Sequence, residues 1–242
     1  IESTGKFTDA AKAKAHLDAG AAFVIISAPA KGNVKTIVPG VNEGILNGSE
    51  QIISCASCTT NNAAPMIQIL EENWGIESAH ITTVHAYTGD QNLHDAPHKD
   101  LRRARAAAHS IIPTTTGAAK AVTAVFPHLE GKLGGAGMRV PVISGSLTDI
   151  TCILKIDSTV EQINVSFRQA AIGKFKSILE YTEDPIVSVD IIGNPHSCIF
   201  DAKLTSVLGR MVKVVGWYDN EMGYSHRLCE LAVRVGRKVF SN

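Results

Sequence analysis

Apolar side chains recur at two different spacings along the first third of the chain. Residues 9–19 place them at helical spacing and stop before a glycine, which predicts a helix. Residues 22–27, 35–38 and 51–53 are short β-branched runs bounded by turn residues, which predict strands. Helical spacing returns over residues 63–73. Because strand, helix and strand in this order are typical of a doubly wound α/β sheet, we expect part of such a sheet here.

Beyond residue 80 the pattern predicts mostly strands. The predicted helices are residues 118–126, 160–171 and 224–239. The predicted strands are residues 80–87, 138–142, 147–154, 186–192, 197–200 and 211–218. Most of these strands follow each other without an intervening helix, which predicts an α+β part with a largely antiparallel sheet. Residues 134–137, Gly-Gly-Ala-Gly, lack the strand–turn–helix context of a dinucleotide-binding fingerprint and are predicted to be a loop.

Composition narrows the class of protein. The chain has 242 residues, with 23 basic and 23 acidic ones, which argues against general binding to nucleic acid or to acidic membranes. No apolar run reaches the ~20 residues of a membrane span. Five cysteines without disulfide-like spacing and no visible signal peptide indicate a reducing, cytoplasmic location. The chain begins at Ile1 within the end of a predicted strand, so we expect an N-terminal part to precede it.

The strongest candidate for chemistry is Cys58, which lies between a predicted strand end and a predicted helix start. Free N–H groups and the positive end of the helix dipole at such a position favour the thiolate, which is the nucleophilic form. Ser57, Thr59 and Thr60 add hydroxyl groups that could cap the helix or hold an anion. A buried cysteine beside ordinary capping residues remains the alternative.

The pair Cys55 and Cys58 also forms a CxxC motif. A zinc site would need two further ligands at a matching spacing, and Cys152, Cys198 and Cys229 stand alone. A thioredoxin-like redox pair belongs in a different fold context. We therefore expect neither a metal site nor a redox motif here.

Five further features are candidate binding or catalytic groups. His85, at the end of a predicted strand, is the best candidate base for Cys58, although without a partner a bond to a backbone carbonyl is the favoured interpretation. The segment 114–117, Thr-Thr-Thr-Gly, opens a helix and is either an anion site or a simple cap. Arg139 is either a surface charge or a guanidinium that binds phosphate or carboxylate through paired N–H groups. Asn220 binds a carboxamide or shapes a turn. The basic loop around Arg103 faces solvent, a second subunit or a phosphate.

Taken together, these segments resemble the phosphorylating glyceraldehyde-3-phosphate dehydrogenase family. The motifs that carry the resemblance are Ser57-Cys58-Thr59-Thr60-Asn61, Thr83-Val84-His85-Ala86-Tyr87-Thr88, residues 112–120 (IPTTTGAAK), Met138-Arg139-Val140-Pro141 and Trp217-Tyr218-Asp219-Asn220-Glu221. They occur in the family's order, and the similarity extends over nearly the whole chain.

The resemblance implies a two-domain α/β protein that uses NAD. Residues 1–57 would be the C-terminal remainder of an incomplete Rossmann-type NAD-binding domain, and residues 58–222 the α+β catalytic domain. Residues 223–242 would form a helix that packs back on the NAD-binding domain. The family also implies a cytoplasmic homotetramer with the basic loop at a subunit contact. The residues that select NAD over NADP would precede Ile1, so that choice stays open.

The resemblance also implies roles for individual residues. Cys58 would attack the aldehyde of glyceraldehyde 3-phosphate, His85 would act as the base, and inorganic phosphate would release the product from a thioester. The residues implied to bind the substrate phosphate are Thr88 and Arg139. The residues implied to bind the attacking phosphate are Ser57, Thr59, Thr116 and Gly117, with Arg103 assisting. The residues implied to bind the cofactor are Thr4, Ser27, Asn220 and Tyr224.

Three residues depart from the family pattern. Cys55 stands where the family usually has Asn, Asn62 where it usually has a second Cys, and Met222 where it usually has Trp. None of them is an implied catalytic or anion-binding residue. Two alternatives stay open: an erythrose-4-phosphate dehydrogenase, which shares the Cys/His pair, and a non-catalytic fragment or interaction module, because the N-terminal half of the NAD-binding domain is expected to be missing.

Overall fold

A small parallel sheet is formed by the first part of the chain. In the computed structural model, which describes the backbone of residues 1–240 and side chains through residue 237, its strands are β1 (Val24–Ile26), β2 (Lys35–Thr36) and β3 (Ile52–Ser54). Their order is β1-β3-β2 and every pairing is parallel. Helix α1 (Ala10–Asp18) packs on this sheet, and a 3-10 helix, η1 (Glu43–Ile45), precedes β3. The parallel pairing is the one expected for a piece of a doubly wound sheet.

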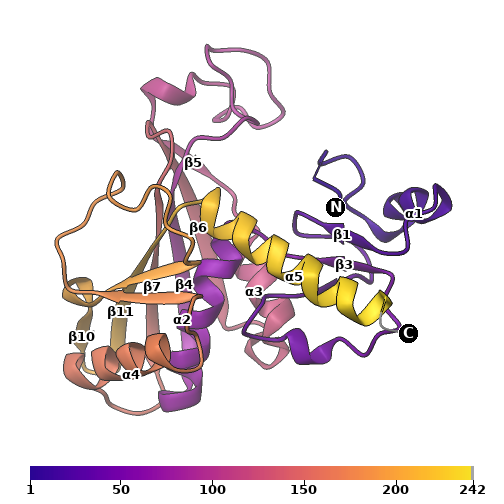
Figure 1. Ribbon diagram of the computed structural model, residues 1–242. Helices are drawn as coiled ribbons and strands as arrows, with labels where there is room; N and C mark the ends of the chain where they lie inside the picture. Colours follow the sequence, from indigo (N-terminus) through magenta and orange to yellow (C-terminus); the bar gives the residue numbers. More distant parts are fainter. Residues whose placement is uncertain (241–242) are drawn as a thin grey trace.

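A larger sheet follows, in the order β5-β6-β4-β7-β11-β9-β8, with β10 also paired to β11 (Figure 1). Its strands are β4 (Ile76–Ala86), β5 (Ile112–Thr114), β6 (Leu133–Val140), β7 (Ser146–Leu154), β8 (Leu179–Thr182), β9 (Cys198–Asp201), β10 (Ser206–Leu208) and β11 (Met211–Tyr218). Only the β4–β6 and β8–β9 pairs are parallel. The predicted largely antiparallel α+β part is therefore confirmed.

Three helices pack on this sheet: α2 (Cys58–Trp74), α3 (Ala118–Val125) and α4 (Val160–Ile172). Met66, Ile67 and Leu70 of α2 are fully buried in the main core. Burial of these side chains is what holds the N-terminus of α2 against the ends of β4 and β11. Short 3-10 helices lie at Ala107–His109 (η2), Pro127–Leu129 (η3) and Ala202–Leu204 (η4).

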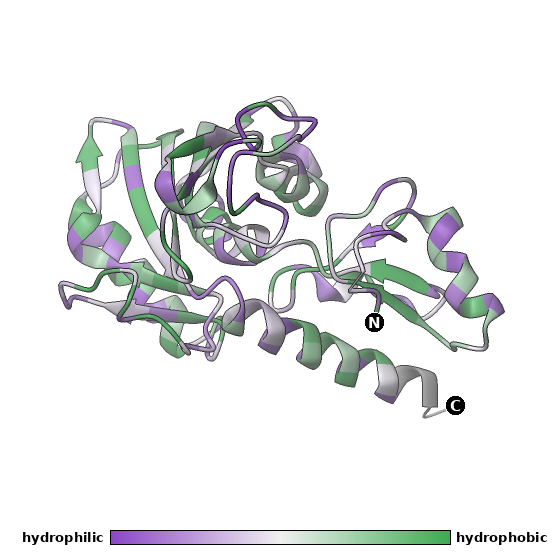
Figure 2. Cartoon of the chain, turned by 90° about the horizontal axis from the view of Figure 1, so that it is seen from above, coloured by the Kyte–Doolittle hydropathy of each residue, from purple (hydrophilic) through white to green (hydrophobic). Residues whose placement is uncertain are grey.

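The last helix, α5 (Met222–Phe240), crosses from the large sheet to the small one (Figure 1). Hydrophobic and hydrophilic residues alternate along it (Figure 2). Leu231 and Val235 form a second core cluster with Ile25 and Ile53 of the small sheet. The two sheets are thus joined by packing as well as by the chain.

Two sequence predictions were wrong. Residues 134–137 are not a loop but part of β6, because their glycines let α3 lie close: a Cβ at Gly135 would meet the Ala119 Cβ at 2.9 Å. Residues 186–192 are not a strand but a series of turns, in which Ile186 N–H bonds Asp184 and Asp190 N–H bonds Val187. Strands β5 (Ile112–Thr114), β8 (Leu179–Thr182) and β10 (Ser206–Leu208) were not predicted.

Candidate active site

Cys58 is the first residue of α2, at the end of a sharply turned loop. Ser57 is the N-cap, and its hydroxyl accepts a hydrogen bond from the Thr60 N–H at 3.2 Å. Ala56 has a φ of 58°, in the left-handed region that L-residues rarely adopt. The Asn61 amide holds this loop by donating to the carbonyls of Cys55 at 2.9 Å and Ser57 at 3.0 Å. The sulfur is therefore fixed at a helix N-terminus.

His85 lies near the end of β4 and faces that sulfur. Its Nε2 atom is 3.4 Å from the Cys58 Sγ atom. Strand register places His85 directly opposite Arg139 of β6. The parallel β4–β6 pair thus brings a nucleophile, a base and a cation from three distant parts of the chain to one place.

Burial opposes charge on both members of this pair. Burial raises the pKa of the Cys58 thiol, although the Thr59 N–H and hydroxyl and the Arg139 charge act to lower it. Burial and then the nearby Arg139 lower the pKa of His85 to about 4. The helix N-terminus is expected to favour the thiolate, but desolvation of the buried sulfur outweighs it. The resting pair is therefore a neutral thiol beside a neutral imidazole.

A cavity of about 340 Å³ opens in front of the pair. It collects most of the residues implied for anion binding, namely Ser57, Thr59, Arg103, Thr116, Gly117 and Arg139. Gly117 is the N-cap of α3 and has no side chain to cap it, and the Thr116 hydroxyl accepts the Ala118 N–H at 3.2 Å, so the start of this helix borders the cavity. Two helix N-termini and two arginines give the cavity a positive potential suited to phosphate.

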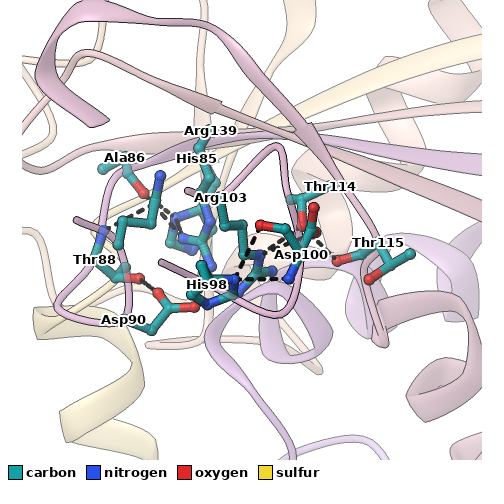
Figure 3. Close-up of polar contacts among 11 residues, drawn as sticks. His85, Ala86, Thr88, Asp90, His98, Asp100, Arg103, Thr114, Thr115 and Arg139 are labelled. Carbon is teal, nitrogen blue, oxygen red and sulfur yellow. Dashed lines mark hydrogen bonds and ion pairs between the residues drawn. The ribbon is translucent and has the colours of Figure 1, made fainter. Parts of the chain in front are cut away.

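Thr88 is not among the residues that line this cavity, but it is tied to it through Asp90 (Figure 3). The Asp90 carboxylate accepts hydrogen bonds from the Thr88 hydroxyl and from Arg103 Nη1. Arg103 Nε also donates to the Thr114 hydroxyl at 2.8 Å. No sequence pattern marks Asp90, because a single aspartate in a polar loop has no distinguishing context.

Two further residues support the pair: Tyr218, which lies in the 217–221 motif without a predicted role, and Ser146. The buried Tyr218 hydroxyl lies 2.9 Å from the hydroxyls of both Thr59 and Thr83, and its ring meets the His85 ring edge-on at 5.9 Å. Ser146 accepts the Ala86 N–H at 3.1 Å. Both contacts depend on the pairing of distant strands and have no local signature.

The residues implied for the cofactor are less closely grouped. Asn220 Oδ1 accepts hydrogen bonds from Gly145 N–H at 3.2 Å and Ser146 Oγ at 3.0 Å. The Tyr224 hydroxyl points at the Ala56 carbonyl at 3.5 Å and interacts with Ser27. The Thr4 hydroxyl donates to Glu2 at 2.5 Å. Asn220, Tyr224, Ser27 and Thr4 all lie outside the lining of the 340 Å³ cavity.

Within the described residues there is no group of three or more His, Cys, Asp or Glu side chains that could hold a metal ion. Over the same residues, no helix combines the length and the apolar character needed to cross a bilayer.

The fold and the site define an α/β protein in which a helix-start cysteine and a strand histidine face an anion-binding cavity. Residues 57–220 match the family described as glyceraldehyde 3-phosphate dehydrogenase, C-terminal domain. The chain belongs to the glyceraldehyde-3-phosphate dehydrogenase family, which confirms the resemblance seen in its motifs.

Named relatives agree with the family match. The chain is 57% identical to the glyceraldehyde-3-phosphate dehydrogenase of Mycobacterium avium over 239 residues, which are 99% of this chain and 70% of that protein. It is 57% identical over 237 residues to glyceraldehyde-3-phosphate dehydrogenase 1 of Streptomyces avermitilis, covering 98% of this chain and 71% of the relative. The Mycobacterium leprae protein named glyceraldehyde-3-phosphate dehydrogenase is 56% identical over 239 residues, which are 99% of this chain and 70% of that protein.

Proposed function

We propose that this chain oxidises glyceraldehyde 3-phosphate with NAD+ and inorganic phosphate to 1,3-bisphosphoglycerate, the glycolytic reaction, through a thioester on Cys58. The observation that carries this proposal is the 3.4 Å contact between Cys58 Sγ and His85 Nε2 at the edge of a positive cavity of about 340 Å³. The relatives named glyceraldehyde-3-phosphate dehydrogenase, which are similar over nearly the whole chain, support it.

His85 moves one proton through the whole oxidation. The imidazole takes the thiol proton, so that the thiolate attacks the aldehyde carbon, and returns it to the oxyanion to give a thiohemiacetal. It takes the proton again from the thiohemiacetal hydroxyl as the hydride leaves. The product of this stage is a thioester on Cys58, and inorganic phosphate attacks its carbonyl to form the acyl phosphate and free the sulfur.

The residues around Asn220 fit the nicotinamide carboxamide of NAD. Because Gly145 N–H can only donate, the Asn220 atom that faces it must be the oxygen, and Ser146 occupies the same oxygen. The Asn220 amide nitrogen is therefore the group turned toward a ligand, and it can donate to a carboxamide carbonyl. NAD+, when bound, supplies the hydride acceptor; we assign Tyr224, Ser27 and Thr4 to the same cofactor.

Two anion positions follow from the cavity. We assign the substrate phosphate to Arg139 and Thr88, because Arg139 makes no ion pair with any carboxylate in the described part of the chain. We assign the attacking phosphate to the starts of α2 and α3, at Ser57, Thr59, Thr116 and Gly117, with Arg103 between the two positions.

We also assign this chain to a cytoplasmic homotetramer. The loop between β4 and β5 and the turn that precedes β7 expose large apolar side chains: Leu93, Leu101, Ile111 and Ile143. An exposed apolar group of this kind favours a contact with another subunit.

The test is NADH formation from glyceraldehyde 3-phosphate, with and without inorganic phosphate, compared with erythrose 4-phosphate. Phosphate-dependent turnover that is much faster with the three-carbon sugar is expected. Faster turnover of erythrose 4-phosphate would identify the chain as an erythrose-4-phosphate dehydrogenase instead. Absence of NADH formation with both sugars would reject the proposed activity.

A further inference from the structure

Three atoms at the base form a triangle (Figure 3). His85 Nδ1 is 2.7 Å from the Ala86 carbonyl oxygen and 2.5 Å from Arg139 Nη1. Arg139 Nη1 is itself 3.0 Å from the same carbonyl oxygen. One ring nitrogen therefore has two close polar partners.

The two partners require opposite protonation states of Nδ1. A guanidinium has only donors, so Nδ1 must present a lone pair to bond Arg139. A carbonyl has only an acceptor, so Nδ1 must carry a proton to bond Ala86. Both contacts cannot be hydrogen bonds in one state. When one of the two hydrogen bonds forms, the other contact is repulsive, because it brings two donors or two acceptors together.

The choice at Nδ1 decides what the other ring nitrogen offers to Cys58. When Nδ1 accepts from Arg139, the neutral ring carries its proton on Nε2, and an N–H faces the sulfur 3.4 Å away. When Nδ1 donates to Ala86, Nε2 presents its lone pair to the sulfur and to any substrate bound there. Only the second tautomer is a base at the reacting atoms.

Arg139 remains on the imidazole because the nearest carboxylate is otherwise engaged. Asp90 attracts Arg139 electrostatically, but its oxygens bond Arg103 and the Thr88 hydroxyl. Arg139 makes no ion pair with the carboxylates of the described residues. A phosphate dianion placed between Thr88 and Arg139 would offer the guanidinium charge-assisted bonds that an imidazole lone pair cannot match.

We propose that the phosphate group of the substrate switches His85 from the Nε2–H to the Nδ1–H tautomer by drawing Arg139 away from the ring. This inference rests on the proposed function, since the phosphate is that of glyceraldehyde 3-phosphate. One proton passes from Nε2 to solvent and one arrives at Nδ1 from solvent, so the ring stays neutral and nothing is oxidised or reduced. The base is thus completed only when a phosphorylated substrate is bound, and unphosphorylated aldehydes meet a ring in the unproductive tautomer.

The test is ¹⁵N NMR of uniformly ¹⁵N-labelled protein, without NAD+, because histidine ring-nitrogen shifts report which nitrogen carries the proton and backbone amide shifts report binding. The probes are glycerol 3-phosphate, which has the phosphate but no aldehyde, and glycerol, which has neither. His85→Asn identifies the His85 signals by their loss. We expect Nε2 to be protonated in the free protein, Nδ1 to become protonated with glycerol 3-phosphate, and no change with glycerol.

Two arginine variants separate the switch from general anion binding. Arg139→Gln should show the Nδ1–H tautomer without any ligand, because no guanidinium faces the ring. Arg105→Gln removes a cation that lies in the basic loop around Arg103 and pairs with Asp95. It leaves the Arg103–Asp90 pair in place, so its free form should keep the wild-type tautomer. A ligand-independent change in Arg105→Gln would contradict the assignment of the effect to Arg139.

The outcomes distinguish this inference from the activity. If glycerol 3-phosphate perturbs the Thr88 amide while the same ring nitrogen of His85 stays protonated, the switch is wrong and the substrate assignment stands. If the free protein already holds the Nδ1–H tautomer, the switch is wrong as well. If no binding is detected, both the switch and the phosphate position fall. A switch without NADH formation in the activity assay would reject the proposed function alone.

Discussion

At the scale of single residues, burial keeps the reactive groups of the site neutral. Burial raises the pKa of Cys58 and lowers that of His85, so neither group is charged near neutral pH. Arg139 contributes in both directions, since it favours a thiolate and disfavours an imidazolium. The 3.4 Å contact then matters more than either pKa alone, because the proton has a short path from sulfur to nitrogen.

The first prediction concerns the nucleophile and the base. Cys58→Ser should abolish NADH formation, and His85→Asn should slow it by about 100-fold or more, the usual contribution of a positioned base. Cys229→Ser is the matched control, because Cys229 is an exposed thiol on α5 away from the cavity. Steady-state rates with glyceraldehyde 3-phosphate provide the measurement, and near-normal turnover by Cys58→Ser would reject the covalent route.

The second prediction concerns stability at mildly acidic pH. His85 titrates near 6.5 when unfolded and at about 4 when folded, so between these values the unfolded state binds more protons. The free energy of unfolding should therefore fall as the pH drops from about 6.5 to about 4. Urea unfolding of wild type and His85→Asn across this range measures it. The variant should show a smaller pH slope, and equal slopes would contradict the burial of a neutral His85.

At the scale of secondary-structure elements, the parallel pairing of β4 and β6 decides which residues meet. It sets His85 opposite Arg139 and Ile81 opposite Gly135 in one register. Gly135 in turn lets α3 approach, and the start of α3 carries the Thr116 and Gly117 end of the cavity. A shift of this pair by one residue would turn the two site side chains to opposite faces.

The third prediction tests that close approach. In Gly135→Ala, the new Cβ would lie 2.9 Å from the Ala119 Cβ and 3.3 Å from the Ile81 carbonyl oxygen, so α3 must move outward. We expect a loss of about 1–3 kcal/mol in the free energy of unfolding, as for other overpacked sites. Gly44→Ala, whose Cβ would meet nothing within 4 Å, is the control and should change stability much less. Urea denaturation measures both, and equal losses would contradict the packing argument.

Local features of the site could be predicted from the sequence, and non-local ones could not. Cys58 was found because a strand end, a capping serine and a helical pattern all lie within a few residues of it. The role of Gly135 is not visible in the sequence, because it depends on the packing of β6 against α3, which lies earlier in the chain. The turns at residues 186–192 had been assigned to a strand because β-branched composition resembles a strand when the partner strands are unknown. Asp90 and Ser146 carry no local pattern, and the contacts of Tyr218 with Thr59 and Thr83 depend on pairings across the fold although Tyr218 lies in the 217–221 motif.

At the scale of the whole molecule, α5 joins the two sheets. Leu231, fully buried, and Tyr224 pack in one cluster with Ile25 and Ile53 of the small sheet. Asn220, just before the helix, accepts a hydrogen bond from Ser146 of the large sheet. The residues assigned to the cofactor and those assigned to the reaction therefore depend on one helix for their relative position.

The fourth prediction is that Leu231→Ala loosens this connection. Removing a fully buried leucine should cost about 2–5 kcal/mol in the free energy of unfolding. Protection of β1 and β3 amides in hydrogen exchange should fall more than that of β4 and β7, because only the small sheet packs on Leu231. The exposed Val233→Ala on the same helix is the control. Equal loss of protection in both sheets would contradict a local role for Leu231.

The last prediction concerns assembly. Leu93 is 79% exposed and lines a shallow pocket with Ile143, so the loop between β4 and β5 presents an apolar surface that water solvates poorly. If this surface is covered by another subunit, Leu93→Glu should place an unpaired carboxylate in the contact and shift the protein to smaller species. Leu208 on β10 is 71% exposed, and Leu208→Glu adds the same charge elsewhere. Light scattering during gel filtration should show a lower mass for Leu93→Glu and an unchanged mass for Leu208→Glu. A tetramer that survives Leu93→Glu would mean that subunits meet through a different surface, and equal dissociation by both variants would attribute the effect to net charge.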